Sequence, residues 1–158
     1  MVNITYRETD QTEIDAIEPL WQMLIEHMRL RSTDFREHYE TITFDSRRTE
    51  LLRKASKGLL HICLARDTDT GKEIGYCVST LVKDGEETEG EIDSLFVDGS
   101  YRSLGIGDTL MKKSLAWMDA GGSTVKKVSV GAGNEGVFKF YEQYGFYPRM
   151  TMLKQIKK

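Results

Sequence analysis

A glycine-rich turn with one arginine is the part of the sequence best suited to hold a ligand. Arg102, Gly105 and Gly107 follow an apolar segment that ends at Val97, and they precede a segment with helical spacing of apolar residues. Glycine lets a ligand approach the main chain closely. The first N–H groups of a helix lack internal partners, and the helix dipole adds positive potential there. The turn therefore predicts a phosphate or diphosphate site. The alternative is a glycine-rich helix start that binds nothing.

Two common nucleotide-binding motifs do not fit this turn. A P-loop requires a lysine directly after its last glycine, but Asp108 follows Gly107. The dinucleotide fingerprint requires a third glycine, but Leu110 stands at that position. The turn therefore belongs to neither class.

Two blocks of the sequence resemble motifs of the GNAT superfamily, the acyl-CoA-dependent N-acyltransferases. The first block is the turn just described, after a strand that ends in LFV. The second is Asn134 after a VSV strand, followed by FYEQYGF over residues 140–146. Together the blocks cover residues 91–147, in the order and separation typical of the family. In the N-terminal third the resemblance concerns only the order of elements.

The resemblance implies acetyl-CoA as the co-substrate, in a gap where the fourth and fifth strands of the sheet splay apart. Its diphosphate would lie on the main-chain amides of the turn, and its pantetheine arm would pair with Leu95 and Val97 as an added strand. Asn134 would contact the arm, would cap the following helix, or would do both. The implied cofactor-binding residues are Leu95, Phe96, Val97, Arg102, Ser103, Leu104, Gly105, Ile106, Gly107, Asp108, Asn134 and Tyr141.

Acyl transfer to an amine needs proton transfer at two atoms. The attacking amine must be neutral, and the departing thiolate gains from a proton donor. Tyr141 matches a tyrosine position of the family, so the resemblance implies that its phenol is the general acid. The alternative is an aromatic ring packed on a helix face beside Phe138 and Tyr144.

Asp93 is the predicted general base. Period-two alternation along a strand would place Glu91 and Asp93 on the same face as Leu95 and Val97. Asp93 stands where several similar family members carry a glutamate, and its shorter side chain favours a relay through water. Glu91 or water alone are the alternative bases. A solvated carboxylate without a catalytic role is the alternative for both acids.

The sequence offers no metal-ligand set and no other nucleophile motif. The histidines His27, His38 and His61 are scattered, and neither H-E-x-x-H nor G-x-S-x-G occurs. Cys63 and Cys77 lie in apolar runs, so we expect both to pack in the sheet. We therefore expect direct transfer in a ternary complex, without a metal and without an acyl-enzyme.

The predicted elements follow the order β-α-α-β-β-β-α-β-α-β, which predicts one α/β (α+β) domain over residues 1–158. Short polar connections predict antiparallel hairpins, and the resemblance implies a mixed, mostly antiparallel sheet flanked by helices. The predicted strands are 2–7, 59–66, 73–83, 91–97, 125–130 and 149–156. A first helical segment is predicted to begin with a capping box at Asp10 and Glu13 and to break at Pro19. A loop is predicted over 31–44. Further helices are predicted from Asp45 to Ser56, over 105–118 and over 135–144.

Composition places the chain among folded, non-membrane proteins. It is 39% hydrophobic and 30% charged, with a formal net charge of −3. That balance disfavours a general nucleic-acid binder, which needs a basic surplus. The sequence has no signal-peptide pattern, no apolar run of membrane-spanning length and only two cysteines, so we expect a cytoplasmic protein without a membrane partner.

The acceptor is the part that the sequence determines least. Segments 21–44 and 147–152 would build its site, where Phe35, His38 and Tyr39 either line the mouth or anchor a long loop. The leading expectation is a small amine or an amino-acid-like molecule. A protein N-terminus or lysine is the second, and a non-catalytic acyl-CoA-binding module is the third. A homodimer through apolar residues near the C-terminal strand is a further hypothesis.

Overall fold

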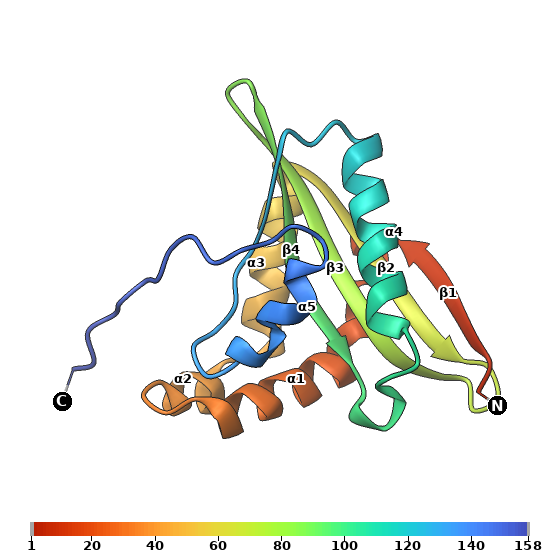
Figure 1. Ribbon diagram of the computed structural model, residues 1–158, viewed down its shortest axis with the longest axis horizontal. Coiled ribbons are helices and arrows are strands. Elements are labelled where there is room, and N and C mark those ends of the chain that lie inside the picture. The colour runs from red at the N-terminus through yellow and green to blue at the C-terminus, as the bar shows by residue number, and fades with distance from the viewer. Residues whose placement is uncertain (1, 158) are drawn as a thin grey trace.

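The computed structural model describes residues 2–157 and contains one five-stranded sheet in the order β1-β2-β3-β4-β5. The strands are β1 (Ile4–Thr9), β2 (Gly58–Asp67), β3 (Lys72–Asp84), β4 (Glu87–Val97) and β5 (Val125–Val128). The first four pair antiparallel to their neighbours, and β5 runs parallel to β4 (Figure 1). The prediction of a mixed, mostly antiparallel sheet is confirmed.

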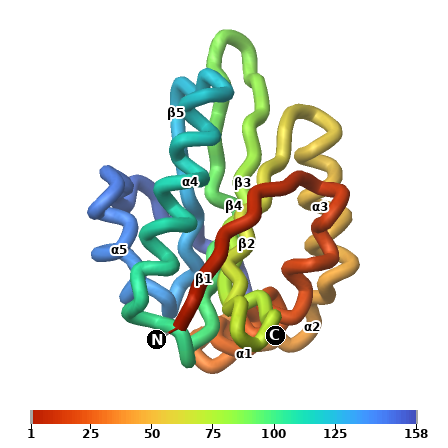
Figure 2. Tube along the Cα trace, turned by 90° about the vertical axis from the view of Figure 1, so that its right-hand side faces the viewer, coloured from red at the N-terminus to blue at the C-terminus, as the bar shows by residue number. Residues whose placement is uncertain are grey.

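Helices cover both faces of this sheet (Figure 2). One face carries the 3-10 helix η1 (Gln11–Ile17) and the helices α1 (Glu18–Arg31), α2 (Arg36–Thr41) and α3 (Phe44–Ser56). The other face carries α4 (Ile106–Ala120), the 3-10 turn η3 (Glu135–Val137) and α5 (Phe138–Glu142). A third 3-10 turn, η2 (Gly99–Tyr101), lies between β4 and α4.

Each face of the sheet has its own apolar core. Trp21 and Leu51 pack with Tyr76 on the α1/α3 face, whereas Met111 packs with Cys77 on the α4 face. Neighbouring residues of β3, such as Tyr76 and Cys77, thus point to opposite cores, as the strand pleat requires. Because both faces are covered, β2 and β3 are nearly continuous apolar runs and show little alternation in sequence.

The N-terminal helical segment begins at Asp10, as predicted, but without a capping box. The Asp10 carboxylate accepts a hydrogen bond from the Thr12 amide at 2.9 Å. Glu13 instead accepts hydrogen bonds from Arg7 and Thr9 of the preceding strand. Pro19 lies in the first turn of α1, where its missing N–H needs no partner. The predicted break therefore falls between η1 and α1.

Two predictions for residues 31–56 are wrong. The expected loop contains α2, a short helix without any buried residue, so no apolar periodicity marks it in the sequence. The cap of α3 is Thr43, whose hydroxyl accepts from the Ser46 amide at 3.2 Å. Asp45 lies inside the first turn of that helix and pairs with Arg48.

The predicted last strand is also wrong. Within residues 2–157, the segment 149–156 pairs with no strand, and it runs away from the body of the molecule (Figure 1). Its apolar side chains are exposed, up to 91% for Leu153. Polar and apolar residues therefore alternate in this segment, but no neighbouring strand or helix of the described chain buries its apolar side chains. Nearby, the predicted strand 125–130 ends at Val128, and the predicted helix 135–144 divides into η3 and α5.

Candidate active site

A β-bulge in β4 decides which way its acidic residues face. Val78 pairs with Ser94, but the next residue of β3 pairs with Ile92, so Asp93 is an extra residue. Residues directly opposite each other share a face. Glu91, opposite Thr80, therefore lies on the α3 face, and Leu95 packs in the core under α4.

The prediction that Glu91 and Asp93 share a face with Leu95 and Val97 is therefore wrong. The cause is the bulge, because one extra residue shifts the alternation of the strand by one. Leu95 and Val97 belong to the α4 side, whereas Lys54 of α3 contacts both carboxylates from the other side.

Three side chains hold the bulge in place. The Asp93 carboxylate accepts from Lys54 Nζ and, at 2.7 Å, from Thr80 Oγ1. Its main-chain carbonyl accepts from Arg47 Nη2 at 2.6 Å. Lys54 also donates to Glu91 Oε1 at 2.7 Å. Since the Asp93 side chain is only 2% exposed, both of its oxygens face protein donors on the α3 side of the sheet.

Burial and these contacts shift the pKa values of Asp93 and Lys54. Desolvation raises the pKa of Asp93, and the hydrogen bonds from Lys54 and Thr80 only partly oppose it. Desolvation lowers the pKa of Lys54, but the hydrogen bonds to Asp93 and Glu91 outweigh it and leave the pKa raised. Lys54 therefore stays charged, and Asp93 is a stronger base than an ordinary aspartate.

Beyond the bulge, β4 leaves β5 and lines a cavity. The parallel ladder ends at the pair Ile92–Val128, and the cavity that follows has a volume of about 570 Å³. Most of the predicted cofactor-binding residues line it, namely Leu95, Phe96, Val97, Arg102, Ser103, Gly105, Ile106, Gly107, Asp108 and Asn134. Leu104 and Tyr141 are not among the lining residues, and Leu104 is 53% exposed.

The glycine-rich turn has the backbone of an anion site. Ser103 and Gly105 both adopt left-handed conformations, with φ of 68° and 76°. Turns of this kind bring successive N–H groups together in anion-binding concavities. Gly105 precedes α4 and provides no side-chain cap, so the amides of the first helical turn lack intrahelical partners. The strained conformation of Ser103 has no signal in the sequence and is typical of functional turns.

Arg102 is fixed at the edge of the cavity by β4. Its Nε donates to the Val97 carbonyl at 3.3 Å, and its guanidinium carbon lies 5.6 Å from the centre of the Phe96 ring. These contacts hold a positive charge beside the left-handed turn, as the sequence predicted.

Tyr141 lies on α5 and packs toward the α4 core. Its ring centre is 5.2 Å from that of Phe140 and 6.2 Å from that of Phe146. Burial raises the pKa of Tyr141, so the phenol keeps its proton. Nearby, Tyr144 donates to the Asp108 carboxylate in the first turn of α4, which ties the segment after α5 to the start of α4 beside the glycine-rich turn.

Helix α1 supplies lining residues that the sequence analysis did not identify. Leu24, His27 and Arg31 line the same cavity, and the His27 ring centre lies 6.2 Å from that of Phe96. Burial lowers the pKa of His27, and the positive charges of Arg31 and Arg102 lower it further. These positions form one helical stripe, which is the signal that could have found them.

The loop after β5 packs closely on α1 and α2. A Cβ atom at Gly131 would lie 2.8 Å from the Tyr39 hydroxyl, and one at Gly133 would lie 2.3 Å from the Arg31 carbonyl oxygen. Gly133 also has a φ of +98°, so this position needs glycine. Tyr39 of α2 thus lies against the loop after β5, and its ring centre is 4.9 Å from that of His38.

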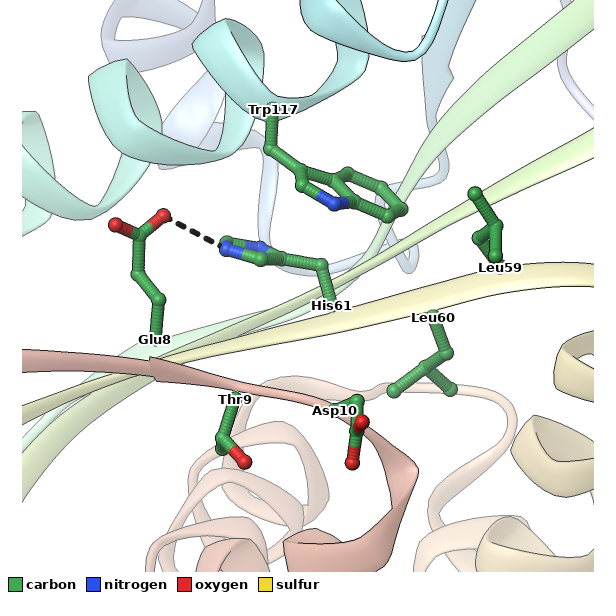
Figure 3. A pocket seen from close by; sticks show the side chains of 7 residues that line it. All are labelled: Glu8, Thr9, Asp10, Leu59, Leu60, His61 and Trp117. Atoms are coloured by element: carbon green, nitrogen blue, oxygen red, sulfur yellow. Dashed lines mark hydrogen bonds and ion pairs between the residues drawn. The ribbon is translucent and has the colours of Figure 1, made fainter.

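A second cavity of about 510 Å³ lies where β1, β2 and α4 meet (Figure 3). In it the His61 ring stacks on Trp117 at 4.9 Å, and His61 Nε2 lies 2.8 Å from Glu8 Oε1. Burial lowers the pKa of His61, although Glu8 opposes this shift. The lining contains none of the predicted site residues. The stacked pair packs α4 against β2.

The two cysteines lie opposite each other in β2 and β3, and both are buried free thiols. Burial raises the pKa of Cys63 to about 12 and that of Cys77 to about 11. They pack in the sheet, as predicted. Within residues 2–157, no three histidine, cysteine or acidic side chains lie close enough to hold a metal ion. No helix in the same range has the length and apolar character needed to cross a membrane.

Comparison with known proteins identifies the class. A model described as the acetyltransferase (GNAT) family matches residues 21–146. The chain therefore belongs to this family. The family implies acetyl-CoA as the co-substrate.

One curated relative and many solved structures are similar. An uncharacterized N-acetyltransferase of Methanocaldococcus jannaschii is 33% identical over 79 residues, which are 48% of this chain and 35% of that relative. The chain therefore spans about a third of that protein. A GCN5-related N-acetyltransferase from Ralstonia eutropha has the same fold (TM-score 0.75, 20% identity, 98% of this chain and 99% of that chain). An aminoglycoside acetyltransferase from an uncultured soil metagenomic sample, solved in complex with sisomicin, also has this fold (TM-score 0.67, 15% identity, 98% of this chain and 97% of that chain).

Proposed function

We propose that this protein transfers the acetyl group of acetyl-CoA to a primary amine by direct attack in a ternary complex. One observation carries the proposal. A single cavity of about 570 Å³ combines the part of β4 beyond the β5 ladder with the left-handed turn at the start of α4. The first feature suits an extended amide-containing arm, and the second suits a diphosphate.

Two parts of acetyl-CoA, the pantetheine arm and the diphosphate, have a matching surface in this cavity. The pantetheine arm lies along Leu95 and Val97 and takes the place of a neighbouring strand. The diphosphate accepts hydrogen bonds from the amides between Arg102 and Asp108, with the Arg102 charge beside them. Asn134, which lines the same cavity, contacts the arm through its side-chain amide.

The reaction forms a C–N bond and breaks a C–S bond. The neutral amine attacks the thioester carbonyl carbon, and the tetrahedral intermediate expels the CoA thiolate. The amine gives one proton to a base, and Tyr141 donates a hydrogen bond or a proton to the thiolate. Support for this role of Tyr141 is its match to the tyrosine position of the family; burial keeps the phenol protonated, so it is able to donate.

Asp93 remains the proposed base, through a water relay. Its raised pKa supports the role, because it brings the carboxylate closer to the pKa of the group that it deprotonates. Its oxygens accept hydrogen bonds from Lys54 and Thr80, so a direct contact with the amine is not part of the proposal. Glu91, which shares Lys54, is the alternative end of the relay.

The proposed acceptor is a small amine. The aminoglycoside acetyltransferase with the same fold was solved with the small amine sisomicin, which supports this class over the N-terminus or a lysine of a protein. A non-catalytic acyl-CoA-binding module is the remaining candidate. The test is release of free CoA thiol from acetyl-CoA over a panel of small amines, amino acids, and peptides with free N-termini or lysines.

We expect release with one amine class and background rates without amine. The matched control is Tyr141→Phe, which should show the same acceptor preference at a much lower rate. Acetyl-CoA binding without release for any amine would favour the binding-module alternative.

The proposed setting is a reducing compartment such as the cytoplasm, supported by two free thiols. A homodimer through the exposed segment 149–156 is also proposed, because Met150, Met152 and Leu153 are 78–91% exposed there. Light scattering tests it: a mass of two chains supports the dimer, and a mass of one chain at high concentration contradicts it.

A further inference from the structure

Helix α1 and the glycine-rich turn bring basic groups together across the cavity of about 570 Å³. His27 and Arg31 lie one helical turn apart on α1, Arg102 lies on the turn, and all three line the cavity. His27 and Arg102 contact the same Phe96 ring, at 6.2 Å and 5.6 Å. The cavity thus has basic groups on two sides.

The two arginines of this cavity have no acidic partner among the described residues. Within residues 2–157, neither Arg31 nor Arg102 takes part in an ion pair. Asp108, the acidic residue of the lining, is already paired with Lys112 and bonded to Tyr144. The cavity therefore carries an uncompensated positive potential, which favours an anion.

The proton affinity of His27 reports the same potential. Burial lowers its pKa, and so do Arg31 on its own helix and Arg102 on the turn, whereas a hydrogen bond with Asn134 opposes the shift. The surroundings of His27 therefore disfavour a charged imidazole.

We propose that His27 and Arg31 form a cationic roof on α1 that binds the phosphate groups of acyl-CoA from the side opposite α4. This inference rests on the proposed function and extends it, because it adds a second helix to the cofactor site. The phosphates lie between the amides at the start of α4 and the side chains of α1. A bound polyanion also reverses the electrostatic effect on His27, so the imidazole takes up a proton when acyl-CoA binds.

The sign of the pH dependence follows from this coupling. The pKa of His27 is lowered in the free protein and is higher in the complex. The added affinity is therefore present at low pH and is lost as the pH rises through the pKa of the complex. Affinity for CoA should increase as the pH falls from about 8 to about 6.

Arg29 provides a matched control on the same helix. It pairs with Glu26 through two hydrogen bonds of 2.8 Å and 2.6 Å, and it does not line the cavity. Replacement of Arg29 changes the net charge as replacement of Arg31 does, but at a different place. Any effect of overall charge would appear in both variants.

The experiment is calorimetric titration with CoA and with pantetheine, which lacks the phosphates. It compares wild type, Arg31→Gln, Arg31→Lys, His27→Gln and Arg29→Gln at pH 6.5, in two buffers of different ionisation enthalpy. We expect Arg31→Gln to weaken CoA binding roughly 5- to 30-fold, the range of a charge-assisted hydrogen bond. Pantetheine binding should not change, and Arg31→Lys should recover part of the loss.

Proton uptake provides the second readout. Wild type and Arg29→Gln should take up protons when CoA binds, and His27→Gln should not. Equal CoA affinity of Arg31→Gln and Arg29→Gln, or undiminished proton uptake by His27→Gln, overturns the inference alone. A wild-type protein that binds no CoA overturns the proposed function as well. Melting temperatures of all variants exclude loss of folding as the cause.

Discussion

Replacement of Lys54 by methionine tests the clamp on the β4 bulge. Lys54 Nζ contacts Asp93 and Glu91, and methionine keeps a similar length without the charge. The variant leaves the Asp93 carboxylate with Thr80 as its remaining side-chain donor. Because the Asp93 side chain is only 2% exposed, water cannot readily replace the lost ammonium.

The size of the effect follows from burial. Removal of one partner of a buried ion pair costs about 3–5 kcal/mol. Lys54 itself is 26% exposed, so solvent screens part of the pair, and we expect a loss of about 2–3 kcal/mol in the free energy of unfolding at pH 7.5.

The loss should depend on pH. The pKa of Asp93 is already raised in the folded protein, and removal of Lys54 raises it further. A carboxyl group with a raised folded pKa stabilises the fold below its unfolded pKa and loses that contribution as the pH rises through the folded pKa. The deficit of Lys54→Met should therefore be largest at pH 7.5 and shrink as the pH falls, because the Asp93 carboxylate then takes up a proton.

Urea unfolding of both proteins at pH 7.5 and pH 5 measures this difference. The control is Lys57→Met, at the end of the same helix and without an ion pair to Asp93 or Glu91. The double variant Lys54→Met/Asp93→Asn should recover part of the stability, because the most deeply buried carboxylate, that of Asp93, is then replaced by a neutral amide. A loss below about 0.5 kcal/mol, or an equal loss at both pH values, would show that Lys54 does not stabilise the charged Asp93 carboxylate.

Other changes test the proposed site. Tyr141→Phe should lower turnover roughly 10²- to 10⁴-fold and leave acetyl-CoA affinity unchanged; near-wild-type turnover removes the acid role. Gly107→Val should fold, because a Cβ atom at this position meets only the Phe140 ring, at 3.4 Å. The variant should bind CoA more than about tenfold more weakly. Titration curves equal to those of the wild type would contradict the placement of the diphosphate at this turn. Gly133→Ala should lose about 2–4 kcal/mol of stability by chemical denaturation, because its Cβ would lie 2.3 Å from a main-chain oxygen. Gly136→Ala, which meets nothing within 4 Å, is its control, and equal losses would rule out the steric explanation.

The sequence predicted the parts of the site that are local in the chain. Arg102, Gly105 and Gly107 act within one turn, so their spacing is visible without knowledge of the fold. The direction of Asp93 depends instead on its register with β3 and on Arg47 and Lys54 of α3. Those partners lie 46 and 39 residues away, and no alternation pattern reveals an extra residue in a strand.

In the fold, too, the features that depend on local sequence were predictable, and those that depend on distant partners were not. Antiparallel hairpins follow from short polar connections, and the predictions of β2, β3 and β4 were correct within a few residues. The segment 149–156 alternates like a strand, but a strand also needs a partner, and within residues 2–157 it has none. The sequence did not predict that His27 and Arg31 line the cavity, because their position depends on how α1 packs against β4 and the glycine-rich turn.

Titration of the purified protein with acetyl-CoA in a calorimeter is the sharpest test of the proposed cofactor site. We expect saturable binding at one site per chain, competed by CoA and weakened by Gly107→Val. Absence of binding by the folded wild-type protein would contradict the proposed cofactor site, because the left-handed turn and the free part of β4 would then hold no cofactor.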